Sequence, residues 1–261
     1  MRIGTGTIVA PIDLMYVREW ACHNLRLGIS DMWMGLNDFT DEELLQFHRT
    51  LADLIQERRV HPFRMDGKGK QLACNNQSLC LANSIGIDWL FLIDIDEFLK
   101  IRSNRTLNQI LEDHDGHPAV SVHWRLFGSN GQEHQAPFPV QERFTKCEAN
   151  LNRHLKTGVN LKWFRERGLP PPLSAHPHFV NATTISIDGR QTFGPFEDIE
   201  LNRPRELELS HYAVKSKDEC MVRRSYRRCD VGVPRQEGWE SFFNAHDKND
   251  VESSEIGFIQ R

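Results

Sequence analysis

The stretch Trp89-Leu90-Phe91-Leu92-Ile93-Asp94-Ile95-Asp96-Glu97 decides how the rest of the chain is interpreted. Its apolar run is typical of a strand buried on both faces, as in the middle of a parallel or mixed sheet. An uncompensated buried charge is costly, so the acids are expected where the strand leaves the sheet. Open α/β sheets bind ligands at that edge. Two alternating carboxylates with a third beside them favour Mg²⁺ or Mn²⁺, ions that can hold a diphosphate.

The composition is that of a globular chain. It has 261 residues, 39% of them hydrophobic, and a formal net charge of −4. This balance offers no basic face for nucleic acid. No apolar stretch approaches the roughly 20 residues of a transmembrane helix, and the N-terminus does not resemble a signal peptide. The six cysteines form no Cys-x-x-Cys pair, so we expect reduced thiols and a cytoplasmic protein.

Strand and helix patterns alternate three times before Asp94. Strands are predicted over 5–11, 29–36 and 60–63, and helices over 15–27, 42–58 and 71–85. This repeat predicts a parallel α/β sheet with right-handed crossovers. The carboxyl ends of its strands lie at one edge, so Asp38, which follows the second strand, is expected near Asp94.

The pattern after Asp94 is less regular. It predicts helices over 107–111 and 217–228, a strand over 119–127, and extended segments over 138–146, 185–187 and 206–209. Neither a repeat nor a convincing linker divides the chain. We therefore expect a single domain over 1–261.

Short motifs follow one another along nearly the whole chain. They are Glu19-Trp20, Leu27-Gly28-Ile29, Asn37-Asp38-x-x-Asp41, Gln71, Trp89 to Phe98, Phe127-Gly128-Ser129-Asn130-Gly131, Glu142-Arg143-Phe144-Thr145, Lys156, His176-Pro177-His178 and His211-Tyr212-x-x-Lys215-Ser216. The ordered set resembles the family 92 glycosyltransferases, formerly domain of unknown function 23, in the GT-A superfamily. The chain looks like a soluble bacterial relative. It departs from the family at Ile12-Asp13, where the family usually has Asn-Glu.

The resemblance implies a fold and an activity. The fold is of GT-A type, with a Rossmann-like mixed sheet flanked by helices, a nucleotide-binding half over 1–100 and an acceptor-binding half over 101–261. The activity is a metal-dependent, inverting transfer of a sugar, often galactose, from a UDP-sugar to a glycan hydroxyl, with Mn²⁺ or Mg²⁺ as cofactor. We expect a role in surface polysaccharide synthesis, with a glycan or lipid-linked oligosaccharide as acceptor. Peripheral contact with the inner membrane would then use a basic patch at Arg223, Arg224, Arg227 and Arg228.

The resemblance also implies roles for single residues. Asp96 is expected to be the direct metal ligand, with Asp94 as a second ligand nearer the ribose. His211 is expected to complete the metal shell, with His176 and His178 as rivals. The candidates for donor binding are Asp13, Asp38, Gln71, Asp94, Lys156 and Lys215.

An inverting displacement needs a base that takes the proton of the acceptor hydroxyl. Glu142, after the glycine-bracketed loop, is the first candidate, and Glu133 and the pair Glu197-Asp198, of which Asp198 is preferred, are its competitors. Glu97 is expected either to orient its neighbours or to be a solvated or salt-bridged acid. Trp124 is expected in the core rather than stacked on a sugar.

Two other functions stay open. One is a Mg²⁺-dependent phosphotransferase or hydrolase with Asp94 as nucleophile, although such enzymes carry Asp-x-Asp after their first strand. The other is a non-catalytic nucleotide-sugar-binding relative, which the altered Ile12-Asp13 pair allows.

Overall fold

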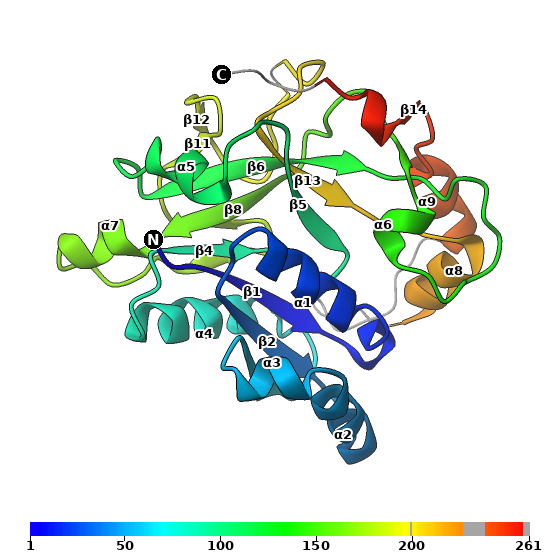
Figure 1. The fold of residues 1–261 in the computed structure, drawn as a ribbon, viewed down its shortest axis with the longest axis horizontal. Coiled ribbons are helices and arrows are strands. Elements are labelled where there is room, and N and C mark those ends of the chain that lie inside the picture. Colours follow the sequence, from blue (N-terminus) through cyan, green and yellow to red (C-terminus); the bar gives the residue numbers. More distant parts are fainter. Residues whose placement is uncertain (199, 227–237, 258–261) are drawn as a thin grey trace.

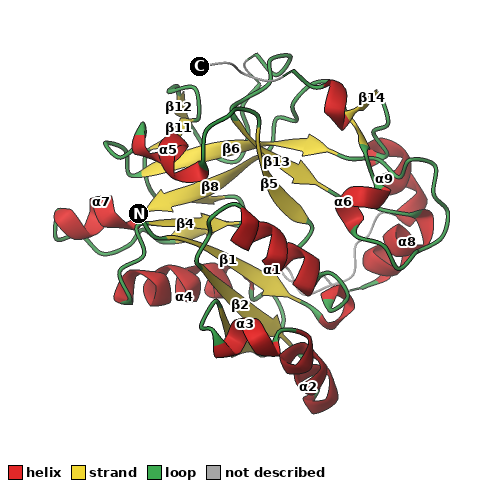
Figure 2. Ribbon diagram, in the orientation of Figure 1, coloured by secondary structure: helices red, strands yellow, loops and turns green. Residues whose placement is uncertain are grey.

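A mixed β-sheet runs through the centre of the molecule, with helices packed against it (Figures 1 and 2). The structure is a computed structural model that describes residues 1–198, 200–226 and 238–257. The first strands are neighbours in the parallel order β3-β2-β1-β4. Their bounds are β1 Ile3–Val9, β2 Asp31–Asn37, β3 Val60–Met65 and β4 Trp89–Leu92, and the intervening helices are α1 Val17–Arg26, α2 Asp41–Thr50, α3 Ala52–Gln56 and α4 Gln71–Ser84. The predicted strand–helix repeat is confirmed.

The sheet becomes mixed beyond β4. Strand β8 (Leu155–Asn160) lies antiparallel between β4 and β6 (Ala119–Leu126). Strand β13 pairs with β6 and with β5, and its register places His211 opposite Glu97. The strands that complete this sheet are β5 Glu97–Ile101, β11 Thr184–Ser186, β12 Gln191–Thr192 and β13 Leu207–His211. The predicted α/β class, with a mixed sheet flanked by helices, is confirmed.

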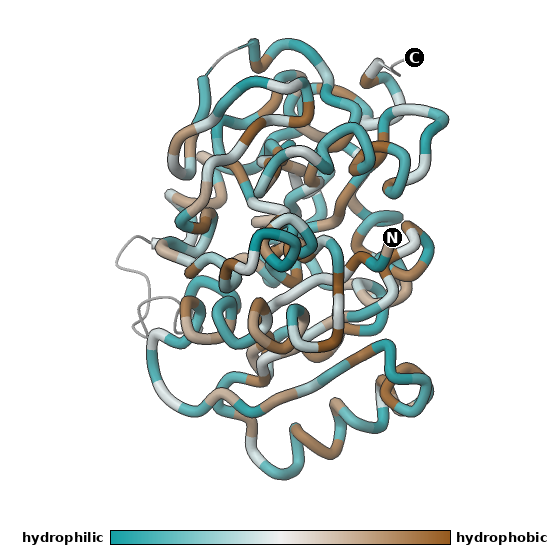
Figure 3. Tube along the Cα trace, turned by 90° about the vertical axis from the view of Figure 1, so that its left-hand side faces the viewer, coloured by the Kyte–Doolittle hydropathy of each residue, from teal (hydrophilic) through white to brown (hydrophobic). Residues whose placement is uncertain are grey.

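The two faces of β1 pack against different helices. Ile3 and Val9 belong to the core cluster that contains Trp20 of α1. Ile8 instead packs with Cys74 of α4. The helices therefore cover opposite faces, and the central strands are buried on both sides, as the apolar run predicted. Figure 3 shows that the outer loops are mostly hydrophilic.

Short elements surround the sheet. They are η1 Pro11–Asp13, α5 Leu107–Glu112, α6 Val140–Arg143, β7 Lys146–Cys147, α7 Leu161–Glu166, β9 Ser174–His176, β10 Phe179–Val180, α8 Lys217–Ser225, α9 Trp239–His246, β14 Val251–Glu252 and η2 Ser253–Glu255. None of the helices in the described ranges is long and apolar enough to cross a membrane.

Three predicted segments need correction. The helix predicted over 42–58 is divided at Leu51, whose φ of −119° and ψ of 21° are not helical. The extended segment predicted over 138–146 contains α6, because the Glu19 carboxylate accepts hydrogen bonds from the first two backbone N–H groups of that helix. The helix predicted over 217–228 ends at Ser225, and Arg227 and Arg228 lie outside the described residues.

Candidate functional site

A cavity of about 300 Å³ opens beside the turn that follows β4. Its lining combines a charged wall with an aromatic and histidine-rich wall, formed mainly by Gln71, Asp94, Asp96, Trp124, His154, His178, His211, Arg223 and His246. The pairing of β13 with β5 and β6 brings the second wall to the first, since it sets the end of β13 beside the acids. The site therefore forms between segments from both halves of the sequence.

Asp94 is held in place by two hydrogen-bond donors. Gln71 Nε2 donates to Asp94 Oδ1 at 2.8 Å, and Lys156 Nζ donates to Asp94 Oδ2 at 2.7 Å. Lys156 is buried. Both carboxylate oxygens of Asp94 thus already act as acceptors. This arrangement fits an anchoring role and disfavours Asp94 as a metal ligand or as the nucleophile of a phosphotransferase.

Glu97 closes the turn that carries the acids. Its Oε2 accepts a hydrogen bond from the Asp94 backbone N–H at 2.7 Å and lies 3.5 Å from Lys156 Nζ. Burial raises the pKa of Glu97 well above its usual value, although Lys156 opposes that shift. Glu97 is fully buried, so the expectation of a solvated acid is wrong and its contacts are those of an orienting residue.

Asp96 faces a histidine and two cations. Its Oδ1 lies 3.8 Å from His211 Nε2, and its Oδ2 lies 3.9 Å from Lys215 Nζ. Burial by itself would raise the pKa of Asp96, but the charges of Lys215 and Arg223 help to lower it well below the usual range. Burial also lowers the pKa of His211 to about 3, against the opposing effect of Asp96. The His211 imidazole is therefore neutral at pH 7, the form that binds metal ions.

Asp96 and His211 fit a divalent cation as a pair of ligands. Their separation of 3.8 Å is too long for a hydrogen bond. Two ligands that each lie about 2.1 Å from one ion are roughly 3 to 4 Å apart. Within residues 1–198, 200–226 and 238–257, no three His, Cys, Asp or Glu side chains are arranged to hold a metal. Protein ligands beyond this pair are thus not assembled among the described residues.

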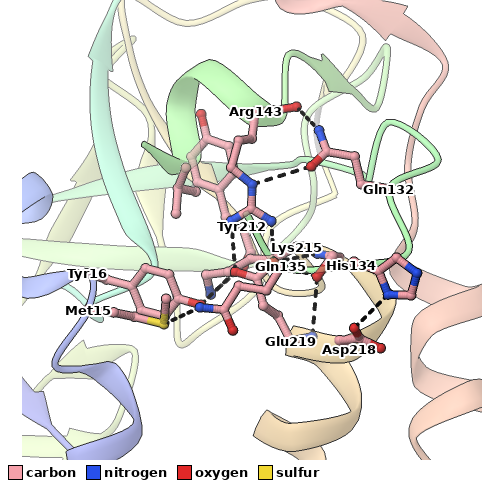
Figure 4. Close-up of polar contacts among 12 residues, drawn as sticks. Met15, Tyr16, Gln132, His134, Gln135, Arg143, Tyr212, Lys215, Asp218 and Glu219 are labelled. Carbon is pink, nitrogen blue, oxygen red and sulfur yellow. Dashed lines mark hydrogen bonds and ion pairs between the residues drawn. The ribbon is translucent and has the colours of Figure 1, made fainter. Parts of the chain in front are cut away.

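A buried network braces the turn that carries Lys215 (Figure 4). Lys215 has a φ of 56°, and its Nζ donates to the Tyr212 carbonyl at 3.1 Å above the ring of Tyr16. The Glu219 carboxylate accepts a hydrogen bond from the Tyr16 hydroxyl at 2.6 Å and pairs with the Arg143 guanidinium. These bonds tie the first turn of α8 to the N-terminal half and keep the Lys215 ammonium beside the acids.

Asp13 is also close to the acids, but it is engaged elsewhere. Arg223 Nη1 lies 2.9 Å and 3.0 Å from its two carboxylate oxygens, and the Ala10 N–H donates to Oδ2 at 3.1 Å. Burial raises the pKa of Asp13 in spite of Arg223. Asp13 and Lys215 line a second, smaller cavity of about 110 Å³. The contacts of Asp13 are those of an anchor between α8 and the first loop.

Asp38 is not among the described residues that line the main cavity. Its Oδ1 accepts a hydrogen bond from the Gly67 N–H at 2.6 Å, and its φ is 55°. The expectation that Asp38 joins Asp94 at one ligand site is therefore not supported by its position. Its contact links the loop after β2 to the loop between β3 and α4.

The three predicted bases lie outside the main cavity as the described residues define it. All three are exposed, Glu142 on α6, Glu133 in an ion pair with Lys217 at 2.8 Å, and Asp198 in an ion pair with Arg153 at 3.0 Å. Glu197, the neighbour of Asp198, is buried 3.2 Å from His123 and does not line this cavity either. The glycine-bracketed loop precedes Glu142, as the sequence shows, but α6 does not bring that carboxylate to Asp96. None of these three acids is therefore placed to accept a proton inside the main cavity.

The histidine-rich wall also contains His154 and His246, which were not predicted from the sequence. The indole of Trp124 stacks on His154 with ring centroids 4.6 Å apart, and His211 lies at 4.2 Å from it. Trp124 is thus packed between imidazoles, which confirms its expected place in the core. His154 stands two residues before Lys156, and side chains two residues apart point to the same face of a strand. That spacing would have placed His154 at the site if β8 had been predicted.

Comparisons with known proteins add only distant structural similarity. No family model and no curated protein matches the sequence. One similar solved structure is the galactosyltransferase LgtC in complex with donor and acceptor sugar analogues, with a TM-score of 0.40, 12% identity, and coverage of 97% of this chain and 98% of that one. An active-site mutant of LgtC gives a TM-score of 0.40 and 13% identity over the same shares of the chains. HddC from Yersinia pseudotuberculosis gives 0.36 and 8%, over 72% of this chain and 91% of that one.

Proposed function

We propose that this chain is a glycosyltransferase of GT-A type, related to family 92, that transfers a sugar from a UDP-sugar to a glycan hydroxyl with inversion. The first donor to consider is UDP-galactose. The observation that carries the proposal is the pairing of Asp96 and His211 in the main cavity, with the Lys215 ammonium 3.9 Å from Asp96 behind them. This grouping combines a pair of metal-type ligands with a cation suited to phosphate oxygens.

The charged wall suits a leaving diphosphate. Mn²⁺ or Mg²⁺ bound by Asp96 and His211 would supply Lewis-acid stabilisation of the developing negative charge. Lys215 adds positive charge 3.9 Å from Asp96, with an ammonium group that the Tyr212 carbonyl already orients. Arg223 lines the same cavity and adds positive charge. These groups are fixed before the reaction, so little reorganisation is needed as charge develops on the phosphate.

The histidine-rich wall suits a neutral, polyhydroxylated ligand. Trp124 Nε1, His178 Nδ1 and His211 Nδ1 are buried and have no hydrogen-bond partner in the described part of the chain. Burial lowers the pKa of His178 to about 2, so its ring is uncharged at pH 7. Buried polar groups in folded proteins are nearly always satisfied. Sugar hydroxyls, which both donate and accept hydrogen bonds, are partners that would satisfy these three atoms.

Calorimetric titration of UDP, with and without Mn²⁺, tests the proposed donor site. We expect wild type to bind UDP in the presence of Mn²⁺, and Asp96→Asn to lose this metal-dependent binding while keeping its circular dichroism spectrum. Asp198→Asn is the matched control, because Asp198 is an exposed carboxylate outside the cavity. UDP release from a panel of UDP-sugars then tests turnover.

Each outcome of the titration has a defined meaning. UDP binding that does not depend on Asp96 contradicts the assigned site. No UDP binding under any metal condition contradicts the glycosyltransferase proposal. UDP binding without turnover of any UDP-sugar favours the non-catalytic relative.

A further inference from the structure

The proposed reaction requires a proton acceptor, and the histidine-rich wall contains one with a defined geometry. We propose that His154 is the catalytic base, and that its Nε2 takes the proton of the acceptor hydroxyl. This inference rests on the proposed function, because it assigns one step of that reaction. It replaces Glu142, Glu133 and Asp198, which lie exposed outside the cavity.

The hydrogen bonds of His154 define which ring nitrogen is free to act. Its backbone N–H donates to Asn152 Oδ1 at 3.2 Å, so that atom is an acceptor. The ring Nδ1 lies 2.6 Å from the same oxygen and must therefore carry a proton. The Asn152 side chain is also hydrogen-bonded to the Glu148 carboxylate, which agrees with this amide orientation. The lone pair then lies on Nε2, which has no hydrogen bond to any of the described residues.

The ring of His154 is also fixed in its orientation. Trp124 stacks on one side with ring centroids 4.6 Å apart and an interplanar angle of 12°. Phe196 makes an edge contact at 4.7 Å and 82°. Two aromatic contacts together with the Asn152 bond leave the imidazole little freedom to rotate. A base held in one orientation needs no rearrangement before proton transfer.

Other proton-accepting side chains of the cavity have different contacts. Asp94 binds Gln71 and Lys156, and His211 faces Asp96. These groups belong to the donor side of the cavity. His178 also lines the cavity, but its Nδ1 is buried and is assigned above to a sugar hydroxyl. His246 is the remaining competitor, because it lines the same cavity and its Nδ1 lies 2.9 Å from a backbone carbonyl. The experiment below therefore includes it.

The proposed step is a displacement with one proton transfer. The acceptor oxygen forms a bond to the anomeric carbon as its O–H bond breaks and the proton moves to Nε2 of His154. The bond between the anomeric carbon and the phosphate oxygen breaks, and its electron pair leaves with the diphosphate. The imidazolium keeps its Nδ1–H bond to Asn152 and later gives its proton to water. Burial lowers the pKa of His154 to about 4, so the ring begins unprotonated at pH 7.

Two readouts on a set of histidine variants test the proposal. His154→Gln, His154→Ala, His246→Gln and the control His117→Gln are compared with wild type, since His117 is exposed and does not line the cavity. The first readout is UDP affinity with Mn²⁺ by calorimetry. The second is transfer from UDP-galactose to a panel of methyl hexosides, followed by UDP release and product mass.

We expect His154→Gln to keep UDP affinity within about threefold and to lose transfer by roughly 10²- to 10⁴-fold, the usual contribution of a general base. Added imidazole should restore part of the transfer by His154→Ala, because a free base can occupy the vacated space. His117→Gln should match wild type. Rescue by imidazole separates proton transfer from a merely structural role, which a small base would not restore.

Four results would overturn the proposal. Transfer by His154→Gln within about threefold of wild type removes His154 as the base and leaves the proposed function intact. A large loss in His246→Gln with normal transfer by His154→Gln moves the role to His246. Parallel loss of UDP binding and transfer in His154→Gln, without imidazole rescue, indicates a structural role. Wild type that binds UDP and transfers no sugar from any member of the UDP-sugar panel overturns the base and the proposed function together.

Discussion

Replacing Lys156 by Met is expected to lower the free energy of unfolding by about 3 kcal/mol. Lys156 is 1% exposed, and its Nζ lies 2.7 Å from Asp94 Oδ2 and 3.5 Å from Glu97 Oε2. Breaking a buried ion pair by removing one partner costs about 3–5 kcal/mol, because the other charge loses its counter-ion. Met keeps most of the apolar stem, so the change in packing is small.

The expected loss lies at the lower end of that range because neither acid is left as a fully buried, unpaired charge. The Asp94 side chain is 31% exposed, so water partly replaces the lost ammonium group. Glu97 is fully buried, but its raised pKa favours the neutral form, which needs no counter-ion. The expected loss therefore reflects mainly the lost Lys156–Asp94 interaction. Adding Asp94→Asn to Lys156→Met should recover part of it, since coupling energies of contacting residues are about 0.5–3 kcal/mol.

Urea unfolding at pH 7, followed by tryptophan fluorescence, measures these differences. The matched control is Lys217→Met, because Lys217 Nζ lies 2.8 Å from Glu133 Oε1 in an ion pair exposed to water. Nearly the same distance occurs in both pairs, and only burial differs. We expect no measurable change in the control, since water screens exposed ion pairs. An equal loss in both variants, or a loss below about 1 kcal/mol in Lys156→Met, would refute the reasoning.

Two further predictions concern the sheet and the pH dependence of stability. Gly158→Ala should destabilise the fold by about 1–3 kcal/mol, because the added Cβ would meet the buried Phe91 ring at 2.6 Å. In the control Gly116→Ala the added Cβ has no neighbour within 4 Å. Urea unfolding of both variants measures the difference. Burial lowers the pKa of His23 to about 4, below the value of about 6.5 in the unfolded chain. The unfolded state therefore takes up a proton first as pH falls, and the free energy of unfolding drops by about 2 kcal/mol between pH 7 and pH 5. His23→Gln should flatten that part of the stability profile, and an unchanged slope would contradict the assignment.

Much of the first hundred residues was predictable because each element carries its own local signal. Thr40 has the side chain of a helix cap before α2, and the Glu43 N–H donates to its hydroxyl at 3.3 Å. Gly28 follows α1 with a φ of 89°, a conformation that glycine adopts readily after a helix. Strand β8 carries no such signal. It holds Lys156 and Gly158, residues that do not indicate a buried strand, and Lys156 is tolerated there only because the acids after β4 neutralise it.

The part of the candidate site that comes directly after a buried strand could be predicted from the sequence. The apolar run alone predicted Asp94 and Asp96 as site residues, whereas His211 was predicted from the ordered motifs of the family. Glu142 was chosen as the base because it follows the glycine-bracketed loop at a short distance in the sequence. That distance does not determine direction, because Glu19 caps α6 from another helix and sets how Glu142 points. His154 had no motif, and its hydrogen bond to Asn152 becomes informative only once Trp124 is seen to pack against it.

The turn after β4 gives three neighbouring carboxyl groups three different environments. Asp94 receives hydrogen bonds on both oxygens and acts as an anchor for Lys156. Glu97 is enclosed by the core, and its raised pKa fits the neutral state that burial favours. Asp96 remains opposite His211 and Lys215, with a lowered pKa that keeps it charged. Because its neighbours meet the structural demands of the turn, Asp96 is the carboxylate left to meet a ligand, and this is why the tests of the donor site begin with it.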